Sequence, residues 1–272
     1  MVSKCLLGMR NMVWAFLCGM MLCACGGDKT TARFDGVEFD SVVIDTVAKL
    51  GTSADAPKCE LKLSIQYAKG DHSQPLNDTL MRSGILVPDY SLMTGGKWSV
   101  RQLVDSFTCK YLSDYKRDYG RLYQEDTEHG SSYNCQYFVR TETRNGGNDV
   151  LNYMAHVYLF GGGEHGINQT IVKNFDIKTG HLFTLDDVFV SGYEASVKEM
   201  ILDKLLERFD VKTLDELQKK YIFADGNVYI PDNFILDEDQ LTFIYCEDEI
   251  APHDIGEIRV DFDKGDLKKY MR

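Results

Sequence analysis

Apolar and polar side chains alternate along much of the first half of the chain. In residues 59–67, CELKLSIQY, every second position is apolar or Cys, and Glu, Lys, Ser and Gln occupy the positions between. This period of two predicts a β-strand with one face toward a core and the other toward solvent. Residues 134–144 alternate in the same way, and residues 37–48 are rich in Val and Ile, so two further strands are expected there.

Glycine and asparagine mark the turns of a strand-rich middle region. Residues 145–148, Asn-Gly-Gly-Asn, tolerate positive φ and predict a hairpin that leads into a strand at 149–160. Four glycines in residues 161–166, GGGEHG, then interrupt the pattern. Later strands are predicted at residues 168–177, 227–230, 233–237, 240–246 and 257–262.

Spacings of three and four residues between apolar side chains predict two main helices. The first covers residues 99–125, with Ser99 as a favourable N-cap. The second covers residues 193–209, where apolar side chains recur on one face. A short helix is expected at residues 213–222, and residues 74–86 form either a short helix or an irregular connection.

The order of these elements predicts an α+β fold. Strands come first, then a helix, antiparallel strands, helices and strands again, which favours largely antiparallel sheets with helices packed on one face. The chain from residue 37 onward is long enough for one large or two small lobes. The glycine-rich break is the best boundary between two lobes, which gives an N-terminal lobe at 37–160 and a C-terminal lobe at 161–272.

Composition and charge narrow the class of partner. The 272 residues are 44% hydrophobic and 26% charged, which is ordinary for a globular protein. The 42 acidic residues outnumber the 30 lysines and arginines, so the formal net charge is −12. Because such a surface repels phosphate backbones, nucleic-acid binding is excluded, and a cationic protein is the partner that long-range attraction favours. The alternative is that the charge only keeps the protein soluble.

The start of the chain has the order of a secretion signal. Two cations precede an apolar run at residues 12–23, which is short for a membrane span. The run ends in Leu-Cys-Ala-Cys, which resembles the lipobox of bacterial lipoproteins. That resemblance implies a signal peptide at residues 1–24, lipid attachment to Cys25 and a tether at residues 25–36. Gly26 after the Cys implies delivery to the outer membrane, with the protein facing either the periplasm or the cell surface. An ordinary cleaved signal with a chance Cys is the alternative.

Four cysteines remain beyond the lipidation residue. In an exported protein they meet an oxidising compartment, where disulfides form. Four cysteines allow three connectivities, and the spacing does not choose among them. The alternative is that they are small, buried apolar side chains. The candidates for a disulfide are Cys59, Cys109, Cys135 and Cys246.

The glycine-rich break also holds candidate chemistry. His165 beside Glu164 could bind a ligand or carry a proton, while exposed backbone N–H groups of the glycines could bind an anion. The favoured alternative is structural, since glycines allow a sharp turn at positive φ and a close approach of strands. His253 is a third candidate for ligand binding, although it is distant in sequence.

No signature of a metal site, a cofactor site or a nucleophile is present in the sequence. There is no HExxH, no CxxC pair and no GxSxG elbow, so neither a metal nor a cofactor is expected. The acidic runs at 186–187 and 247–249 lack the spacing of an EF-hand and are typical of solvated surface. Cys135 and His156 could meet across a hairpin, but a strand cysteine is normally buried and inert.

The second half of the chain contains an ordered set of motifs. They occur at residues 160–166 (FGGGEHG), 174–180 (NFDIKTG), 183–189 (FTLDDVF), 241–245 (LTFIY) and 250–256 (IAPHDIG). This set resembles the extracytoplasmic domain of RsiV-type anti-sigma factors, which also occurs in peptidoglycan deacetylases outside their catalytic domain. The resemblance covers roughly residues 155–270, and residues 58–145 more loosely resemble the smaller domain that precedes it. The chain departs from the family pattern at Glu164, Asp248 and His253.

The resemblance implies a binding or sensory module, because the family domain recognises lysozyme outside the cell. The segment that binds a sigma factor and the deacetylase domain have no counterpart in this sequence, so those roles are not carried over. We therefore expect a lipid-anchored, non-catalytic envelope protein that recognises a lysozyme-like protein or a cell-wall ligand. An envelope hydrolase acting on cell-wall polymer is the alternative, and an architectural lipoprotein is a third.

Overall fold

The structure is a computed structural model that describes residues 34, 36–70, 73–88, 98–224 and 226–272. The predicted signal peptide, the predicted lipidation residue Cys25 and most of the predicted tether lie outside these residues. Among the helices that the structure describes, none is both long enough and apolar enough to cross a bilayer.

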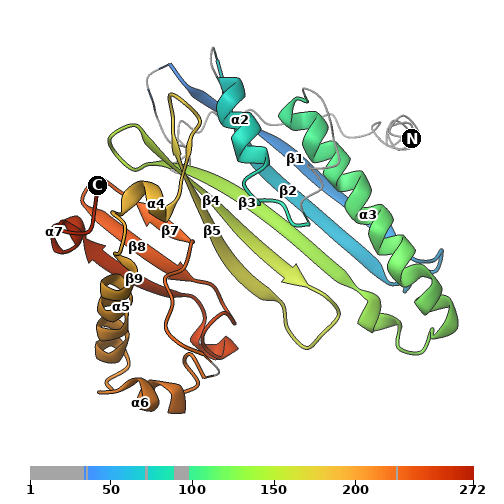
Figure 1. The fold of residues 1–272 in the computed structure, drawn as a ribbon. Coiled ribbons are helices and arrows are strands. Elements are labelled where there is room, and N and C mark those ends of the chain that lie inside the picture. Colours follow the sequence, from blue (N-terminus) through green and yellow to red (C-terminus); the bar gives the residue numbers. More distant parts are fainter. Residues whose placement is uncertain (1–33, 35, 71–72, 89–97, 225) are drawn as a thin grey trace, which may run out of the picture.

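Six strands form one large sheet in which neighbours in sequence are also neighbours in space (Figure 1). All neighbouring pairs are antiparallel except β2 and β3, which run parallel. A parallel pair needs a long crossover, and two helices and a 3₁₀ turn occupy it. The strands are β1 (Glu38–Lys49), β2 (Lys58–Lys69), β3 (Cys135–Asn145), β4 (Val150–Phe160), β5 (Ile167–Asp176) and β6 (Leu182–Phe183). The crossover contains α2 (Ser73–Met81), α3 (Val100–Glu125) and η2 (Gly130–Tyr133).

Helices α2 and α3 lie along one face of the large sheet (Figure 1). The alternating apolar residues of β2, including Leu61 and Leu63, share a buried cluster with Val104 and Phe107 of α3. Ser99 caps α3 as predicted: its hydroxyl accepts the Gln102 N–H, and the Gln102 side chain accepts the Ser99 N–H. The helix therefore begins at a fixed residue and presents its apolar face to the sheet.

The rest of the chain, residues 184–272, forms a second layer that we call the C-terminal layer. Three antiparallel strands form a small sheet, and the buried face of α5 packs with it through side chains such as Ile201 and Leu205. The strands are β7 (Phe234–Leu236), β8 (Gln240–Tyr245) and β9 (Ile258–Asp263). The helices are α4 (Leu185–Val188), α5 (Glu194–Arg208), α6 (Leu214–Lys219), η3 (His253–Ile255) and α7 (Lys264–Leu267). The predicted α+β class, with two sheets that are largely antiparallel, is confirmed.

The small sheet packs on the face of the large sheet that the helices leave open. Neighbouring residues of a strand point to opposite faces. Accordingly, Tyr153 of β4 belongs to the helix-side cluster, while Met154 packs with Ile235 of β7 and Ile244 of β8. Buried side-chain amides reinforce this contact, because Asn174 of β5 donates to the Phe234 carbonyl. The two sheets thus share a continuous, partly polar joint.

The glycine-rich break is a turn inside the large sheet. Strands β4 and β5 pair across it along ten residue pairs, from Val150 with Asp176 to Leu159 with Ile167. The buried cluster on the helix side ends with Phe175, and the cluster of the C-terminal layer resumes at Leu185. The packing of the core therefore changes near residue 184, and the lobe boundary at 160/161 stays a prediction.

Residues 227–230, predicted as a strand, form no strand pairing. The Tyr229 carbonyl accepts the hydroxyl of Tyr245, and the Tyr229 ring packs edge-on against Phe223 and Tyr245. Tyr229 of this segment therefore serves an aromatic cluster beside the small sheet, and the strand prediction is wrong.

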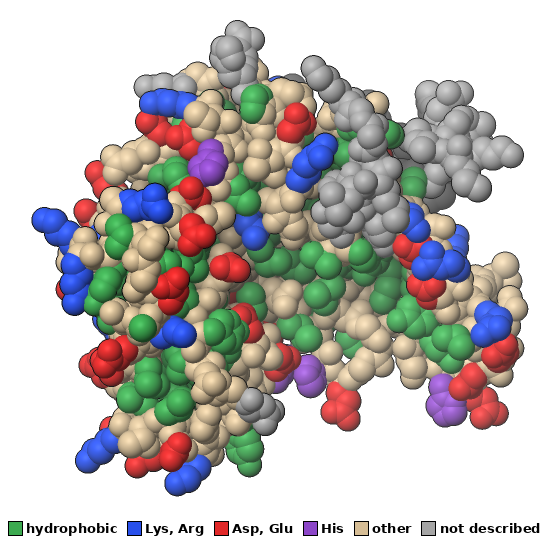
Figure 2. Space-filling model, in the orientation of Figure 1, with side chains coloured by type: hydrophobic (Ala, Val, Ile, Leu, Met, Phe, Trp, Pro, Cys, Tyr) green, Lys and Arg blue, Asp and Glu red, His purple; other side chains and the backbone are tan. Residues whose placement is uncertain are grey.

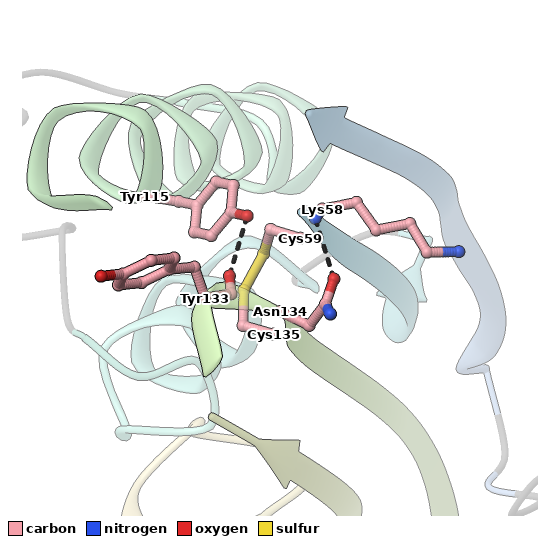
Figure 3. The surroundings of a disulfide bond; sticks show 6 residues. All are labelled: Lys58, Cys59, Tyr115, Tyr133, Asn134 and Cys135. Carbon is pink, nitrogen blue, oxygen red and sulfur yellow. Dashed lines mark hydrogen bonds between the residues drawn. A yellow bond between two sulfur atoms is a disulfide. The ribbon is translucent and has the colours of Figure 1, made fainter. Parts of the chain in front are cut away.

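Cys59 and Cys135 form a disulfide between the parallel strands β2 and β3 (Figure 3). The two residues are direct partners in the register of this pair, with Cα atoms 4.5 Å apart. The Lys58 N–H donates to the Asn134 side chain beside the bond. The same bond excludes the considered pair of Cys135 with His156, which faces Arg140 in the register.

The other two cysteines in the described part, Cys109 and Cys246, stay outside the disulfide. Burial raises the pKa of the Cys246 thiol to about 11, so it is protonated at neutral pH. The thiol is half-buried, donates to the Thr170 carbonyl and accepts from the Asn233 amide. A disulfide in a chain with a secretion-like start is consistent with a location outside the cytoplasm.

Candidate functional site

The uncovered half of the large sheet forms a hollow of about 590 Å³. Its floor is the face of β1 to β5 that points away from α2 and α3, and the C-terminal layer covers only the β4–β5 end of that face. Glu247, Gly256 and Glu257 of the C-terminal layer form one wall. The hollow therefore lies where the two sheets meet, which is a common place for binding sites. On the strands it is lined by Val43, Asp45, Lys62, Ser64, Phe138, Arg140, His156, Tyr158, Asn168 and Thr170.

Partly exposed aromatic rings form the centre of the hollow. The Phe138 and Tyr158 rings lie 5.7 Å apart between centroids, on the neighbouring strands β3 and β4. The Lys62 Nζ stands 5.2 Å from the centroid of Phe138, within the range of a cation–π contact. Because the rings stand on paired strands, they present a rigid apolar surface with a cation at its edge.

Charged groups of both signs surround these rings. The Arg140 side chain is 60% exposed, and its guanidinium lies 3.9 Å from Glu142. The Nε2 atom of His156 lies 3.4 Å from the other carboxylate oxygen of Glu142. An aromatic centre with Arg and acidic groups around it has the composition of a recognition surface.

At the rim of the hollow the structure brings together two of the predicted site residues. His165 stands in the β4–β5 turn and His253 in η3, and their ring centroids are 4.0 Å apart. Glu164 is exposed, and the acid that joins the two rings is Asp248 instead. Asp248 Oδ2 lies 3.2 Å from His253 Nδ1. Sequence reasoning missed Asp248, because an acidic run gives no sign of what faces it.

Each of the three acids of the 247–249 run has a partner, and Glu247 shares His253 Nδ1 with Asp248. Glu247 Oε1 lies 3.1 Å from His253 Nδ1, and its other oxygen accepts the Asn168 N–H of β5. Glu249 accepts the Cys246 N–H and the Tyr229 hydroxyl. This run is therefore part of the joint between the sheets and is not simply a solvated surface.

Gly162 shapes the turn that holds His165. Its φ is +83°, and a Cβ built there would overlap the carbonyl oxygen of Ser132 in η2. Both roles predicted for glycines in this turn, positive φ and close approach, are met at this position. The adjacent Gly163 has open space around its position.

Gly162→Ala is expected to lower the free energy of unfolding by about 2 kcal/mol or more, since positive φ and a backbone overlap add together. Gly163→Ala is the matched control and should change it by about 0.5 kcal/mol or less. Urea denaturation of both variants checks this. Equal stability of the two would contradict the packing of this turn against Ser132.

Comparison with known proteins finds a family match within the C-terminal layer. Residues 186–264 match the family model described as "Protein of unknown function (DUF3298)". We refer to these matched residues as the DUF3298 domain. It contributes Glu247, Asp248 and His253, while His165 comes from the large sheet. The histidine pair therefore joins the DUF3298 domain to the rest of the protein.

Two solved structures share the fold. A crystal structure of a DUF3298 family member from Bacteroides fragilis has 24% identity and a TM-score of 0.76, with 88% of this chain and 96% of that chain covered. A DUF3298 family protein from Pseudomonas aeruginosa has 15% identity and a TM-score of 0.57, with 88% and 95% covered. No curated protein matches the chain. The shared fold therefore extends beyond the DUF3298 domain into the large sheet.

Proposed function

We propose that this protein is a non-catalytic binding module outside the cytoplasm that recognises a protein or a cell-wall ligand in the hollow. The observation that carries the proposal is the pair of partly exposed rings, Phe138 and Tyr158, at the centre of a concave surface with charged groups around it. Binding energy concentrates in such aromatic positions when a partner excludes water from them. The resemblance to the RsiV-type extracytoplasmic domain supports the same class of function.

The proposed location is the outer membrane, with the protein held by lipid on Cys25. The Leu-Cys-Ala-Cys sequence at residues 22–25 supports the anchor, and two or more acyl chains give stable attachment. The Cys59–Cys135 disulfide supports an oxidising compartment. An anchored module of this kind meets soluble proteins and cell-wall fragments at the envelope.

The proposed protein partner is cationic and lysozyme-like. The net charge of −12 attracts cations over long range, and Asp45, Glu247 and Glu257 line the hollow itself. On the face shown in Figure 2, acidic and basic side chains are mixed over the C-terminal layer. We therefore attribute steering to the net charge and the acids of the hollow, and attribute affinity to the aromatic rings.

Calorimetric titration of the full chain with a lysozyme and with soluble peptidoglycan fragments tests the proposal. We expect one of these probes to bind without turnover, and Tyr158→Ala or Phe138→Ala to weaken it by about 2 kcal/mol, near thirtyfold. Tyr221→Ala is the matched control, since this side chain is 70% exposed, belongs to the DUF3298 domain and does not line the hollow. Circular dichroism confirms that each variant is folded.

Three results would contradict the proposal. Neither probe binds, or the hollow variants bind as the parent does, or the protein releases soluble fragments from peptidoglycan. The last result would identify the alternative, an envelope hydrolase. Lysozyme binding that does not weaken with added salt would count against electrostatic steering.

A further inference from the structure

Side chains with metal-ligand chemistry converge where the β4–β5 turn meets the loop between β8 and β9. His165, Asp248 and His253 each offer one ligand atom, and these atoms all lie within 4.8 Å of one another. His165 comes from the β4–β5 turn, whereas Asp248 and His253 come from the β8–β9 connection, so the cluster results from tertiary packing. Within the described part of the chain, this is the group of His, Cys, Asp and Glu side chains whose ligand atoms lie close enough together to hold a metal ion.

The spacing is close to that of a tetrahedral site. Zinc ligands at about 2.0–2.1 Å from the metal lie roughly 3.4 Å apart along the edges of a tetrahedron. Asp248 Oδ2 is already 3.2 Å from His253 Nδ1. His165 is exposed in a turn, so its side chain is free to adjust toward the other two ligands.

We propose that His165, Asp248 and His253 bind one divalent transition-metal ion, with the chemistry of zinc. Two imidazoles and one carboxylate select zinc or a related ion, because Ca²⁺ and Mg²⁺ prefer ligand sets made of oxygen. Three protein ligands leave a fourth position for water or for an incoming donor group at the rim of the hollow.

Glu247 stabilises the arrangement from outside the ligand set. Its carboxylate contacts His253 and also accepts the Asn168 N–H of β5, so the ring is held in place from the large sheet. A carboxylate beside the liganding nitrogen adds negative charge next to the ion, which favours cation binding. The metal would therefore fasten the DUF3298 domain to the β4–β5 turn, and it stabilises the folded state by binding it selectively.

The same contacts would exist without a metal if protonated His253 simply paired with its two carboxylates. The two explanations differ in their response to added ions. A metal site takes up one ion per chain and depends on both histidines, whereas an ion-paired cluster needs neither His165 nor a metal.

The test is titration of the metal-free full chain with Zn²⁺ and with Co²⁺. We expect one equivalent to bind, a tetrahedral Co²⁺ absorption spectrum without thiolate charge-transfer bands, and a higher melting temperature with Zn²⁺. His165→Ala and His253→Ala should each weaken binding by more than the roughly 10–100-fold that loss of an outer partner costs. Glu247→Gln should weaken binding less than either histidine variant, because it removes a neighbouring charge and not a ligand atom.

His129→Ala is the matched control. His129 also pairs with a carboxylate, its Nδ1 lying 2.9 Å from Asp126, but no second histidine is part of that pair. This variant should still bind one equivalent of metal, show the same Co²⁺ spectrum and gain the same increase in melting temperature with Zn²⁺. Equal uptake by the parent and by both histidine variants, or thiolate bands in the Co²⁺ spectrum, would overturn the site. Circular dichroism separates loss of the ligand from loss of the fold.

Discussion

Removing the Cys59–Cys135 disulfide is expected to lower the free energy of unfolding by about 4 kcal/mol. The bond closes a segment with a sequence separation of 76 residues, which contains the whole crossover between β2 and β3. Constraining a loop of that length in the unfolded chain is worth about 4–5 kcal/mol in the chain-entropy treatment. The bond also holds together the parallel pair, whose strands no short turn connects.

The double variant Cys59→Ala/Cys135→Ala measures this effect by urea denaturation without reductant. Added reductant should destabilise the parent by a similar amount and leave the double variant unchanged. Cys109→Ala is the control, since that residue is outside the disulfide, and it should shift stability by about 1 kcal/mol or less. A double variant within about 1 kcal/mol of the parent would show that the crossover is held by packing alone.

Asn174→Ala is expected to cost about 4 kcal/mol by breaking the joint between the two sheets. The Asn174 side chain accepts the Leu236 N–H at 3.2 Å and donates to the Phe234 carbonyl at 2.9 Å. It also accepts a hydrogen bond from Asn152, and both asparagines are almost fully buried. Two backbone groups of β7 would lose their partners out of reach of water, at about 1–3 kcal/mol each, with a cavity in addition.

Asn168→Ala on the same strand is the matched control for this prediction. Its side chain is exposed, so the free energy of unfolding should change by about 0.5 kcal/mol or less. Chemical denaturation followed by both fluorescence and circular dichroism also reports whether the two sheets still unfold together. A loss below about 1 kcal/mol for Asn174→Ala would mean that apolar packing, and not the amides, holds the joint.

Much of the fold follows from local patterns that one buried face imposes. The alternation in residues 59–67 identified β2, because its solvent-facing positions carry polar groups, and the Ser99 cap identified the start of α3. Pairing between distant segments leaves no local trace. The parallel partnership of β2 with β3 and the bond between Cys59 and Cys135 therefore emerged only in three dimensions.

Segments that are buried on both faces, or that lie beside aromatic clusters, are harder to predict from the sequence. In β4 the residues from Val150 to Ala155 are all buried, because the helices cover one side and the C-terminal layer the other. The glycine-rich turn that follows it looked like a lobe boundary, although both of its flanking strands belong to one sheet. Residues 227–230 are a short apolar run that was predicted as a strand, but Tyr229 makes aromatic contacts and the segment pairs with no strand.

The candidate site was only partly readable from the sequence. His165 drew attention because glycines surround it, and His253 because of the family motif, yet nothing in the spacing indicated that their rings meet. Asp248 belonged to a run that is usually solvated. The hollow itself has no motif, because its aromatic rings and charges come from separate strands that only pairing places side by side.

Hydroxyl-radical footprinting of the full chain with and without bound lysozyme tests the central claim most directly, which is that the hollow is the binding surface. We predict that oxidation of Phe138 and Tyr158 falls on binding, while oxidation of Tyr221 is unchanged. Protection at Tyr221 or on the exposed face of α3, with Phe138 and Tyr158 oxidised as in the free protein, would contradict the account.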